Sequence, residues 1–527
     1  MNARVLVTDN VESSCKEILL SEGFEVDQKP PLKPGELKDL IGGYEALIVR
    51  SSTKVTGADL DAAVRLKVIG RAGAGVDTID VEAATHHGIV VMNTPGGNTI
   101  STAEHTMSLL LSMARNIPQA QASLLSGKWD RKTYIGTELL GKTIGIVGLG
   151  KIGREVALRC KAFGMTTIGY DPLLGPDQAT RIGIEVVALD ELFARSDVIT
   201  VHTPLNDETR NLIGQQQLSM CKTGVRLINC ARGGIINEEA LLAALESGKV
   251  AGAALDVFVK EPPGDHPLLK HPRVVATPHL GASTEEAQEK VARQIALQVA
   301  DFLKGRAVSG AVNADALAQS LRKEIQPFVL LAEKLGMFQA QMLSGSLETL
   351  TVKCAGSLLS TAGELMSSAV LKGFLSQLVS GPVHLISARM KARERGIAVS
   401  ETIESEAGPY TNVLSVECGS AGITRSLAGT VFGTGSLRIV QIDRYLFEVI
   451  PEGHLLLYKN VDRPGMLARV GAILASQGIN IGGLALGRLG PGDLAMTVMN
   501  VDSPIPGGVL EMLQDLEGVS EVRVLKL

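Results

Sequence analysis

The chain has 527 residues, of which 45% are apolar and only 3% aromatic, and its formal net charge is −5. This length exceeds what one hydrophobic core supports, so we expect three or four domains with aliphatic cores. The mild charge and the lack of a basic block argue against a nucleic-acid partner. No apolar run is long enough to span a membrane, and the N-terminus shows no signal peptide, so a cytoplasmic protein is expected.

The cysteines are scattered, without a CxxC pair or a Cys/His cluster. This pattern predicts reduced thiols, with neither a disulfide framework nor a metal site. The positions are Cys15, Cys160, Cys221, Cys230, Cys354 and Cys418.

Residues 1–97 alternate short apolar runs with helical patterns. The runs VLVTD, ALIVRS, LKVIGRAG and GIVVMN are typical of buried parallel strands joined by crossover helices. We therefore expect a first parallel α/β unit here.

A long amphipathic helix is predicted to follow, starting near residue 101. Ser101 and Glu104 have the spacing of a capping box, and apolar residues then recur on one helical face. Strand-like runs resume after this helix, at TIGIV, DVITVHTP, VRLINCA, AGAALDVF and RVVATPH. They predict a second, larger parallel α/β domain over residues 98–285.

A second long helix is predicted over residues 283–304, with Ser283 and Glu286 in capping-box spacing. We expect this helix and the one near residue 101 to carry the chain between the two units. The first unit would then consist of residues 1–97 and 286–310. A faint internal similarity, of ALIVRSS and LKVIGRAGAGVD to DVITVHTP and VRLINCARGG, suggests two related units that face each other across a cleft.

A glycine-rich turn in the second unit predicts a dinucleotide site. Gly148, Gly150 and Gly153 form GxGxxG between the strand TIGIV and a helix, where glycines allow a tight turn, close approach of a pyrophosphate and close helix–sheet packing. Asp171 lies at the end of the next strand, where an acid binds ribose hydroxyls and repels a 2′-phosphate. GxGxxG alone also occurs in ordinary turns, but this combination predicts NAD.

Three polar residues follow successive strands of the second unit: Arg232, Glu261 and His279. Ligands of open α/β sheets bind at the carboxyl ends of the strands, so the three side chains should converge on the cleft. They suit hydride transfer from a 2-hydroxy acid. The histidine takes the hydroxyl proton, the glutamate fixes its tautomer, and the arginine binds the carboxylate.

Each of these three residues also has an ordinary alternative. Arg232 could pair with a structural acid, Glu261 could be a loop charge, and His279 could be a surface or core residue. The three residues follow successive strands in order, after a dinucleotide motif in the sequence, and this combination favours a catalytic role. We interpret Cys230 as a packing residue and not as a nucleophile, because no histidine lies near it in sequence.

The stretches VGLGKIGREVA, NCARGGIINEEAL, AALDVFVKEPP and PHLGAST resemble the D-isomer-specific 2-hydroxyacid dehydrogenase family. The resemblance covers residues 1–310 and implies two Rossmann-like domains, an NAD cofactor and the catalytic roles given above. It also implies cofactor contacts, besides the three glycines, from Thr78, Lys151, Ile152, Asp171, Thr203, Cys230, Ala231, Arg232, Asp256, His279, Gly281 and Ala282.

Two further domains are predicted beyond a linker at 305–316. Residues 317–452 should form an α+β intervening domain, since strand runs with glycine turns fill its second half. Residues 453–527 show the order strand, helix, strand, strand, helix, strand of a ferredoxin-like domain. This last segment resembles an ACT domain, a small-molecule regulatory module.

The ACT resemblance implies that an amino acid binds near the DRPGML turn. We expect Asp462 at a helix N-cap, where it could receive the ammonium group. An aspartate before Pro-Gly also caps helices without any ligand, and this alternative stays open. The residues expected at the regulatory site are Asp462, Pro464, Gly465 and Asn480.

The order of dehydrogenase body, intervening domain and ACT domain resembles a long-form branch of the family. That branch oxidises D-3-phosphoglycerate to 3-phosphohydroxypyruvate, the first step of L-serine synthesis, so the resemblance implies a homotetramer inhibited by L-serine. A phosphorylated substrate needs extra cations, and Arg50 and Arg71 end strands of the first unit. Glycines 73 and 75 should offer backbone N–H groups to an anion. The expected substrate residues are Arg50, Ser51, Arg71, Gly73, Ala74 and Gly75.

Some alternatives remain. Arg131 and Lys132 could reach a neighbouring subunit's site, but a solvated charge run fits them equally well. Another D-2-hydroxy acid could be the substrate, because the same catalytic trio would serve. An NAD-sensing, corepressor-like binding protein is a third possibility, although such proteins lack an ACT domain.

Overall fold

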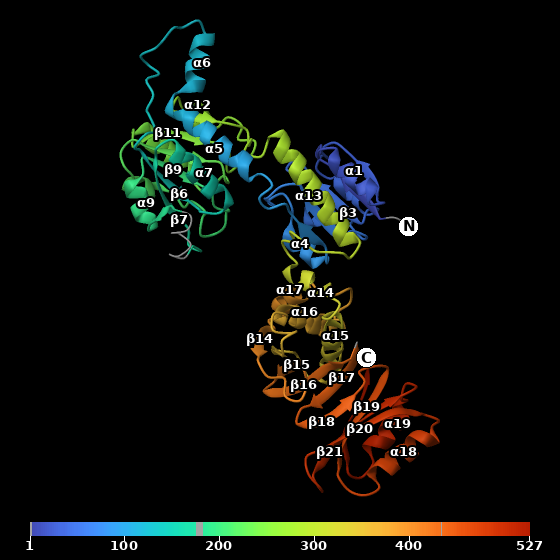
Figure 1. The fold of residues 1–527 in the computed structure, drawn as a ribbon. Helices are drawn as coiled ribbons and strands as arrows, with labels where there is room; N and C mark the ends of the chain where they lie inside the picture. Colours follow the sequence, from blue (N-terminus) through green and yellow to red (C-terminus); the bar gives the residue numbers. More distant parts are fainter. Residues whose placement is uncertain (1–2, 175–182, 434) are drawn as a thin grey trace.

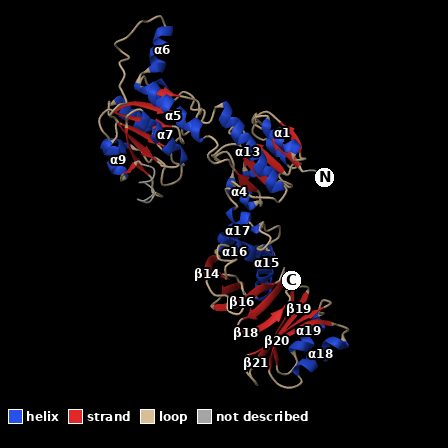
Figure 2. Ribbon diagram, viewed as in Figure 1, coloured by secondary structure: helices blue, strands red, loops and turns tan. Residues whose placement is uncertain are grey.

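The computed structural model describes residues 3–174, 183–433 and 435–527, and its strands form four sheets (Figures 1 and 2). The first sheet is parallel, with the strand order β2-β1-β3-β4-β5. Its strands are β1 (Arg4–Val7), β2 (Glu25–Gln28), β3 (Ala46–Val49), β4 (Val68–Arg71) and β5 (Val90–Met92). The accompanying helices are α1 (Ser14–Ser21), α2 (Glu36–Ile41), α3 (Gly57–Leu60) and α4 (Val81–His86).

The second sheet is also parallel and has the order β12-β11-β10-β9-β6-β7-β8. Its strands are β6 (Thr143–Val147), β7 (Thr166–Tyr170), β8 (Glu185–Val186), β9 (Val198–Val201), β10 (Val225–Asn229), β11 (Val250–Leu255) and β12 (Val274–Ala276). Helices α7 (Lys151–Ala162), α9 (Leu189–Arg195), α10 (Gln215–Met220), α11 (Glu238–Glu246) and α12 (Pro267–Lys270) accompany it. Buried aliphatic strands flanked by helices are what the apolar runs predicted.

Two long helices connect these sheets, as Figure 1 shows: α5 (Thr99–Ala114) and α13 (Glu285–Leu303). The apolar face of α13 packs in the core of the first sheet, although it follows the second sheet in sequence. The two capping boxes predicted from the sequence, at Ser101 and at Ser283, were wrong. Helix α5 starts after Asn98, and Ser101 lies inside it with its hydroxyl turned to Gly281. Helix α13 is capped by Thr284, whose Oγ1 accepts the N–H of Ala287.

A short helix, α6 (Ile117–Leu125), follows α5 and buries none of its residues. With the loop after it, this helix extends away from the second sheet in Figure 1.

The third sheet has the order β14-β13-β15-β16-β17-β18, comprising β13 (Thr349–Ala355), β14 (Ala398–Glu404), β15 (Val413–Ser420), β16 (Ile423–Phe432), β17 (Ser436–Ile442) and β18 (Tyr445–Val449). Its helices are α14 (Asp315–Ser320), α15 (Gln326–Met342), α16 (Gly363–Leu375) and α17 (Ala388–Glu394). This is the α+β fold expected for the intervening segment.

The fourth sheet is antiparallel, with the order β20-β21-β19-β22. Its elements are β19 (His454–Val461), α18 (Met466–Ser476), β20 (Ile481–Arg488), β21 (Leu494–Val501), α19 (Gly507–Gln514) and β22 (Val519–Lys526). This is the predicted βαββαβ order. Leu455, Leu457, Met496 and Val498 of this sheet share one core with the third sheet, so the two segments pack directly together.

All six cysteines are free and buried. Within the described ranges, no three or more His, Cys, Asp or Glu side chains are grouped to hold a metal ion. None of the helices in the described part of the chain has the length and apolar character needed to cross a membrane.

Candidate active site

A cavity of about 560 Å³ lies between the first and second parallel sheets. Side chains from both sheets line it, which places the predicted substrate residues of one sheet opposite the predicted catalytic residues of the other. The lining includes Arg50, Ser51, Arg71 and Gly73 from the first unit and Asp256, Glu261, His279 and Ala282 from the second.

His279 and Glu261 form the hydrogen bond expected from the sequence, with 2.7 Å between Nδ1 and Oε2. The other Glu261 oxygen accepts the N–H of Phe258 at 3.1 Å. Burial alone would raise the pKa of Glu261, but these two hydrogen bonds outweigh burial and lower it. Because a carboxylate only accepts hydrogen bonds, Nδ1 carries the proton, and the Nε2 lone pair is free to take one.

The backbone that carries His279 is held by Asp256. His279 has a φ of 56°, in the left-handed region that a residue with a side chain rarely adopts. The Asp256 carboxylate accepts the N–H groups of Leu280 and Gly281 at 2.7 and 2.8 Å, and the Asp256 carbonyl accepts that of His279 at 2.9 Å. Asp256 therefore fixes the turn that presents the histidine.

Arg71 lies near two other guanidinium groups, those of Arg50 and Arg232. Burial is the largest cause that lowers the pKa of Arg71 to about 10, and the charges of Arg232 and Arg50 contribute to the same shift. The Arg71 Nε is buried and has no hydrogen-bond partner in the described part of the chain. A half-buried cationic cluster of this kind is costly without an anion, so the geometry favours binding of an anionic group.

Arg232 is already paired with an acid, as one alternative foresaw. Its Nε donates to Asp77 at 3.0 Å, and its Nη1 donates to the Ala231 carbonyl at 2.7 Å. Asp77 is largely exposed, so a substrate carboxylate can compete with it for the guanidinium. Gly75 lies against this pair, since a Cβ there would overlap the Arg232 guanidinium.

The glycine loop after β4 only partly matches its predicted role. The N–H of Gly73 donates to the Arg71 carbonyl at 2.8 Å, so it does not offer itself to an anion. No local sequence pattern indicates this contact, which arises from the tight turn beside the Arg71 side chain. Gly73 is needed for space, because a Cβ there would overlap that guanidinium.

Asp9 was missed by the sequence analysis. It is buried, and its Oδ2 accepts the N–H groups of Arg50, Ser52 and Thr53 at 2.9, 3.2 and 2.9 Å. It thereby fixes the loop that presents Arg50 and Ser51 to the cavity. Its position at the end of the neighbouring strand β1 was the available signal.

The residues of the glycine motif fit a dinucleotide. Gly148 has a φ of 95°, and a Cβ on Gly153 would overlap the Gly148 carbonyl. No atom lies within 4 Å of the Cβ position of Gly150, at the start of α7, so that side is open to a pyrophosphate. Asp171 follows β7, and its Oδ2 accepts the N–H of Leu149 at 2.9 Å.

The other predicted cofactor residues lie around this motif. The hydroxyl of Thr203 is buried without a partner among the described residues, which leaves it available to a ligand. Burial raises the pKa of the Cys230 thiol to about 12, which agrees with a packing residue and not a nucleophile. Lys151 is exposed at the start of α7, and Thr78 lies behind the Arg50 loop, with its hydroxyl 3.5 Å from the Arg50 carbonyl. Ile152 packs partly against the core, and Ala231 follows β10 with its N–H donated to Asn229 Oδ1.

The predicted regulatory residues lie in the fourth-sheet segment, away from this cavity. Helix α18 is capped by Gly465, with a φ of 87°, so the N-cap role predicted for Asp462 was wrong. Pro464 directly precedes the capping glycine. Asp462 instead accepts a hydrogen bond from Arg488 Nε at 2.8 Å, and Asn480 donates to Asp502 at 2.7 Å. Arg131 and Lys132 are exposed in the loop after α6 and do not line the cavity.

Comparison with known families assigns three parts of the chain. The model for the NAD binding domain of D-isomer specific 2-hydroxyacid dehydrogenases matches residues 107–281. The D-3-phosphoglycerate dehydrogenase intervening domain matches residues 324–443, and the ACT domain matches residues 454–518.

Relatives match along nearly the whole chain. D-3-phosphoglycerate dehydrogenase of Archaeoglobus fulgidus is 44% identical, covering 99% of this chain and 100% of that protein. The Bacillus subtilis enzyme of the same name is 41% identical, covering 99% of both.

Solved structures resemble the first two units. A glyoxylate reductase from Paecilomyes thermophila is 32% identical with a TM-score of 0.55, covering 59% of this chain and 98% of that one. D-Lactate dehydrogenase from Aquifex aeolicus, complexed with NAD and lactic acid, is 28% identical with a TM-score of 0.52, covering 57% of this chain and 96% of that one. The chain therefore belongs to the D-3-phosphoglycerate dehydrogenases, within the D-isomer specific 2-hydroxyacid dehydrogenase family.

Proposed function

We propose that this protein oxidises D-3-phosphoglycerate to 3-phosphohydroxypyruvate with NAD, at the entry to L-serine synthesis. The observation that carries the proposal is the meeting of Arg50 and Arg71 with a His–Glu pair at one cavity, where the charge of Arg232 also acts on Arg71. The proposed domain division, 1–97 with 286–310, 98–285, 317–452 and 453–527, puts this cavity between the first two domains. The names of the full-length relatives support the substrate.

The proton and the hydride of the substrate go to different acceptors. His279 Nε2 takes the proton of the C2 hydroxyl, and Glu261 stabilises the imidazolium that forms. Arg232 exchanges Asp77 for the substrate carboxylate and polarises the new carbonyl. A bound NAD supplies the acceptor for the hydride from C2, and the residues of the glycine motif with Asp171, Thr203 and the 279–282 turn would hold it.

The substrate phosphate has a place in this scheme, next to Arg71 and Arg50. Arg71 is half-buried, has a buried Nε without a partner among the described residues and lies among like charges, so an incoming dianion would relieve its electrostatic penalty. An unphosphorylated hydroxy acid would leave that penalty in place. This difference favours a phosphorylated substrate over lactate or glyoxylate.

The C-terminal segment is proposed to bind L-serine as a feedback inhibitor, near Asp462, Pro464, Gly465 and Asn480. The ACT family match supports an amino-acid ligand. Because Asp462 is paired with Arg488, the ammonium group of the ligand would have to displace that guanidinium from the carboxylate. The Arg488 side chain would then be free for the ligand carboxylate.

A homotetramer is proposed, with one contact between copies through the arm formed by α6 and the loop to β6. This arm has no buried helical residue, yet it exposes large apolar side chains that a monomer would leave in water. Leu125, Trp129, Ile135 and Leu140 are each at least 74% exposed. Light scattering coupled to size-exclusion chromatography would test it, with Trp129→Glu expected to lower the mass.

The decisive assay follows NADH absorbance with D-3-phosphoglycerate, D-lactate and D-glycerate, each with and without L-serine. A strong preference for the phosphorylated acid and slowing by serine are expected. Faster oxidation of an unphosphorylated acid would refute the substrate assignment. Unchanged rates at saturating serine would refute the proposed inhibitor.

A further inference from the structure

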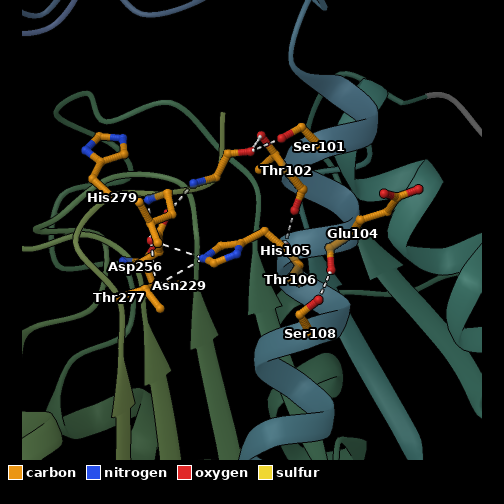
Figure 3. Close-up of polar contacts among 12 residues, drawn as sticks. Ser101, Thr102, Glu104, His105, Thr106, Ser108, Asn229, Asp256, Thr277 and His279 are labelled. Carbon is orange, nitrogen blue, oxygen red and sulfur yellow. Dashed lines mark hydrogen bonds and ion pairs between the residues drawn. The ribbon is translucent and has the colours of Figure 1, made fainter. Parts of the chain in front are cut away.

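One face of α5 is hydrogen-bonded to the turn that carries His279 (Figure 3). The hydroxyls of Ser101 and Thr102 both donate to the Gly281 carbonyl, at 2.8 and 3.1 Å. One turn further along, His105 Nε2 lies 3.0 Å from Thr277 Oγ1 and 3.2 Å from Asp256 Oδ1. Successive turns of this helix are therefore hydrogen-bonded to the two ends of the segment 277–281.

The hydrogen bonds around Asp256 determine which ring nitrogen of His105 carries hydrogen. Thr277 Oγ1 donates its only hydrogen to Asp256 Oδ1 at 2.6 Å, so it can only accept from His105. The Asp256 carboxylate is also only an acceptor. Burial would raise its pKa, but hydrogen bonds from His105, Thr277 and Leu280 lower it. His105 Nε2 therefore carries the hydrogen and donates it between these two oxygens.

We propose that His105 is a positioning residue for hydride transfer. It ties α5, which joins the two units, to Asp256 and Thr277, which hold the left-handed turn of His279. Loss of its N–H leaves Asp256 and Thr277 short of a donor and lets the turn relax away from the strained φ of His279. The inference rests on the proposed role of His279 as the base.

The same helix offers a matched control on its other side. Ser108 Oγ donates to the Glu104 carbonyl of its own helix and is exposed, and Figure 3 shows both residues away from the Asp256 network. Ser108→Ala removes a polar side chain from α5 without touching the turn.

The experiment compares His105→Leu, His105→Gln and Ser108→Ala with the wild type. Stopped-flow NADH formation is measured at saturating NAD and D-3-phosphoglycerate, as a rate per NADH-binding site titrated by fluorescence. We expect His105→Leu to lower this rate about 10- to 100-fold with KM little changed, because small misplacements of a catalytic group have effects of this size. His105→Gln, whose amide retains a donor, should recover most of the rate, and Ser108→Ala should match the wild type.

Two results would overturn the proposal. One is an unchanged rate per site in His105→Leu. The other is a loss equal in His105→Leu and His105→Gln, which would mean that packing and not hydrogen-bond donation matters. The substrate assignment is judged separately on the wild type. If another D-2-hydroxy acid is oxidised faster, the same variants are measured with that acid.

Discussion

Replacing Arg71 by methionine should make the protein more stable and less able to use a phosphorylated substrate. Methionine keeps much of the apolar stem while removing the half-buried cation. The guanidinium has an unpartnered Nε, and two like charges act on it. The free enzyme therefore bears an electrostatic cost that the substrate phosphate would relieve.

The size of both effects can be worked from the structure. A pKa lowered from 12.5 to about 10 corresponds to roughly 3 kcal/mol against the charged form. Because the folded pKa is lowered, this cost is present at every pH below about 10, including neutral pH. We expect Arg71→Met to gain about 1–3 kcal/mol in the free energy of unfolding. Loss of a charge-assisted hydrogen bond of about 1.5–3 kcal/mol should lower kcat/KM for D-3-phosphoglycerate roughly 10- to 150-fold.

Urea unfolding monitored by circular dichroism measures the first effect, and initial rates of NADH formation measure the second. Lys67→Met is the control, since Lys67 is exposed just before β4. An equal loss of kcat/KM for D-3-phosphoglycerate and D-glycerate would refute the assignment of Arg71 to the phosphate. A lower unfolding midpoint in Arg71→Met would refute the argument about the buried charge.

Three further predictions concern the base and the cofactor site. Glu261→Gln keeps a hydrogen-bond acceptor for His279 but removes the negative charge, so kcat should fall about 10- to 1000-fold with KM nearly constant in steady-state kinetics. An unchanged kcat would contradict the proposed role of the carboxylate. Gly150→Ala should fold normally yet lose NADH binding in fluorescence titration. Gly153→Ala should lose NADH binding and also have a lower unfolding temperature, because its methyl group would overlap a backbone carbonyl. Equal unfolding temperatures of the two variants would argue against that packing. The lowered pKa values of Asp256 and Glu261 mean that both carboxylates stabilise the fold above their unfolded pKa of about 4, and that this stability is lost as pH falls through the lowered values. The urea midpoints of wild type and Glu261→Gln should therefore converge as pH drops towards 3. Midpoints that stay a constant distance apart would count against this contribution of Glu261.

Much of the fold followed from local patterns. Central strands buried between helices are apolar along most of their length, so the two parallel sheets could be predicted, without their polar edge strands β2 and β8. The βαββαβ order of the last segment could also be predicted. Helix starts were less predictable. Ser101 and Ser283 have the right spacing for caps, yet the chain turns at Asn98 and Thr284, because packing of α5 and α13 sets where each helix begins.

The candidate site was likewise predictable in part. Local patterns pointed to the glycine motif, Asp171 and the His279–Glu261 pair, since each depends on residue types at strand ends, where the topology of a parallel sheet places ligands. Contacts between distant segments were not predictable. Asp77 meets Arg232 across 155 residues of sequence, and His105 meets Thr277 across 172.

The sequence by itself therefore determined the fold class, the cofactor and the chemical type of the catalytic groups, because these depend on periodicity and on residue types at short spacing. Only the tertiary structure decided which charges face each other in the free enzyme and what holds the catalytic turn. Coulombic and hydrogen-bond energies depend on distance and burial in space. Neither quantity can be read from separation along the chain.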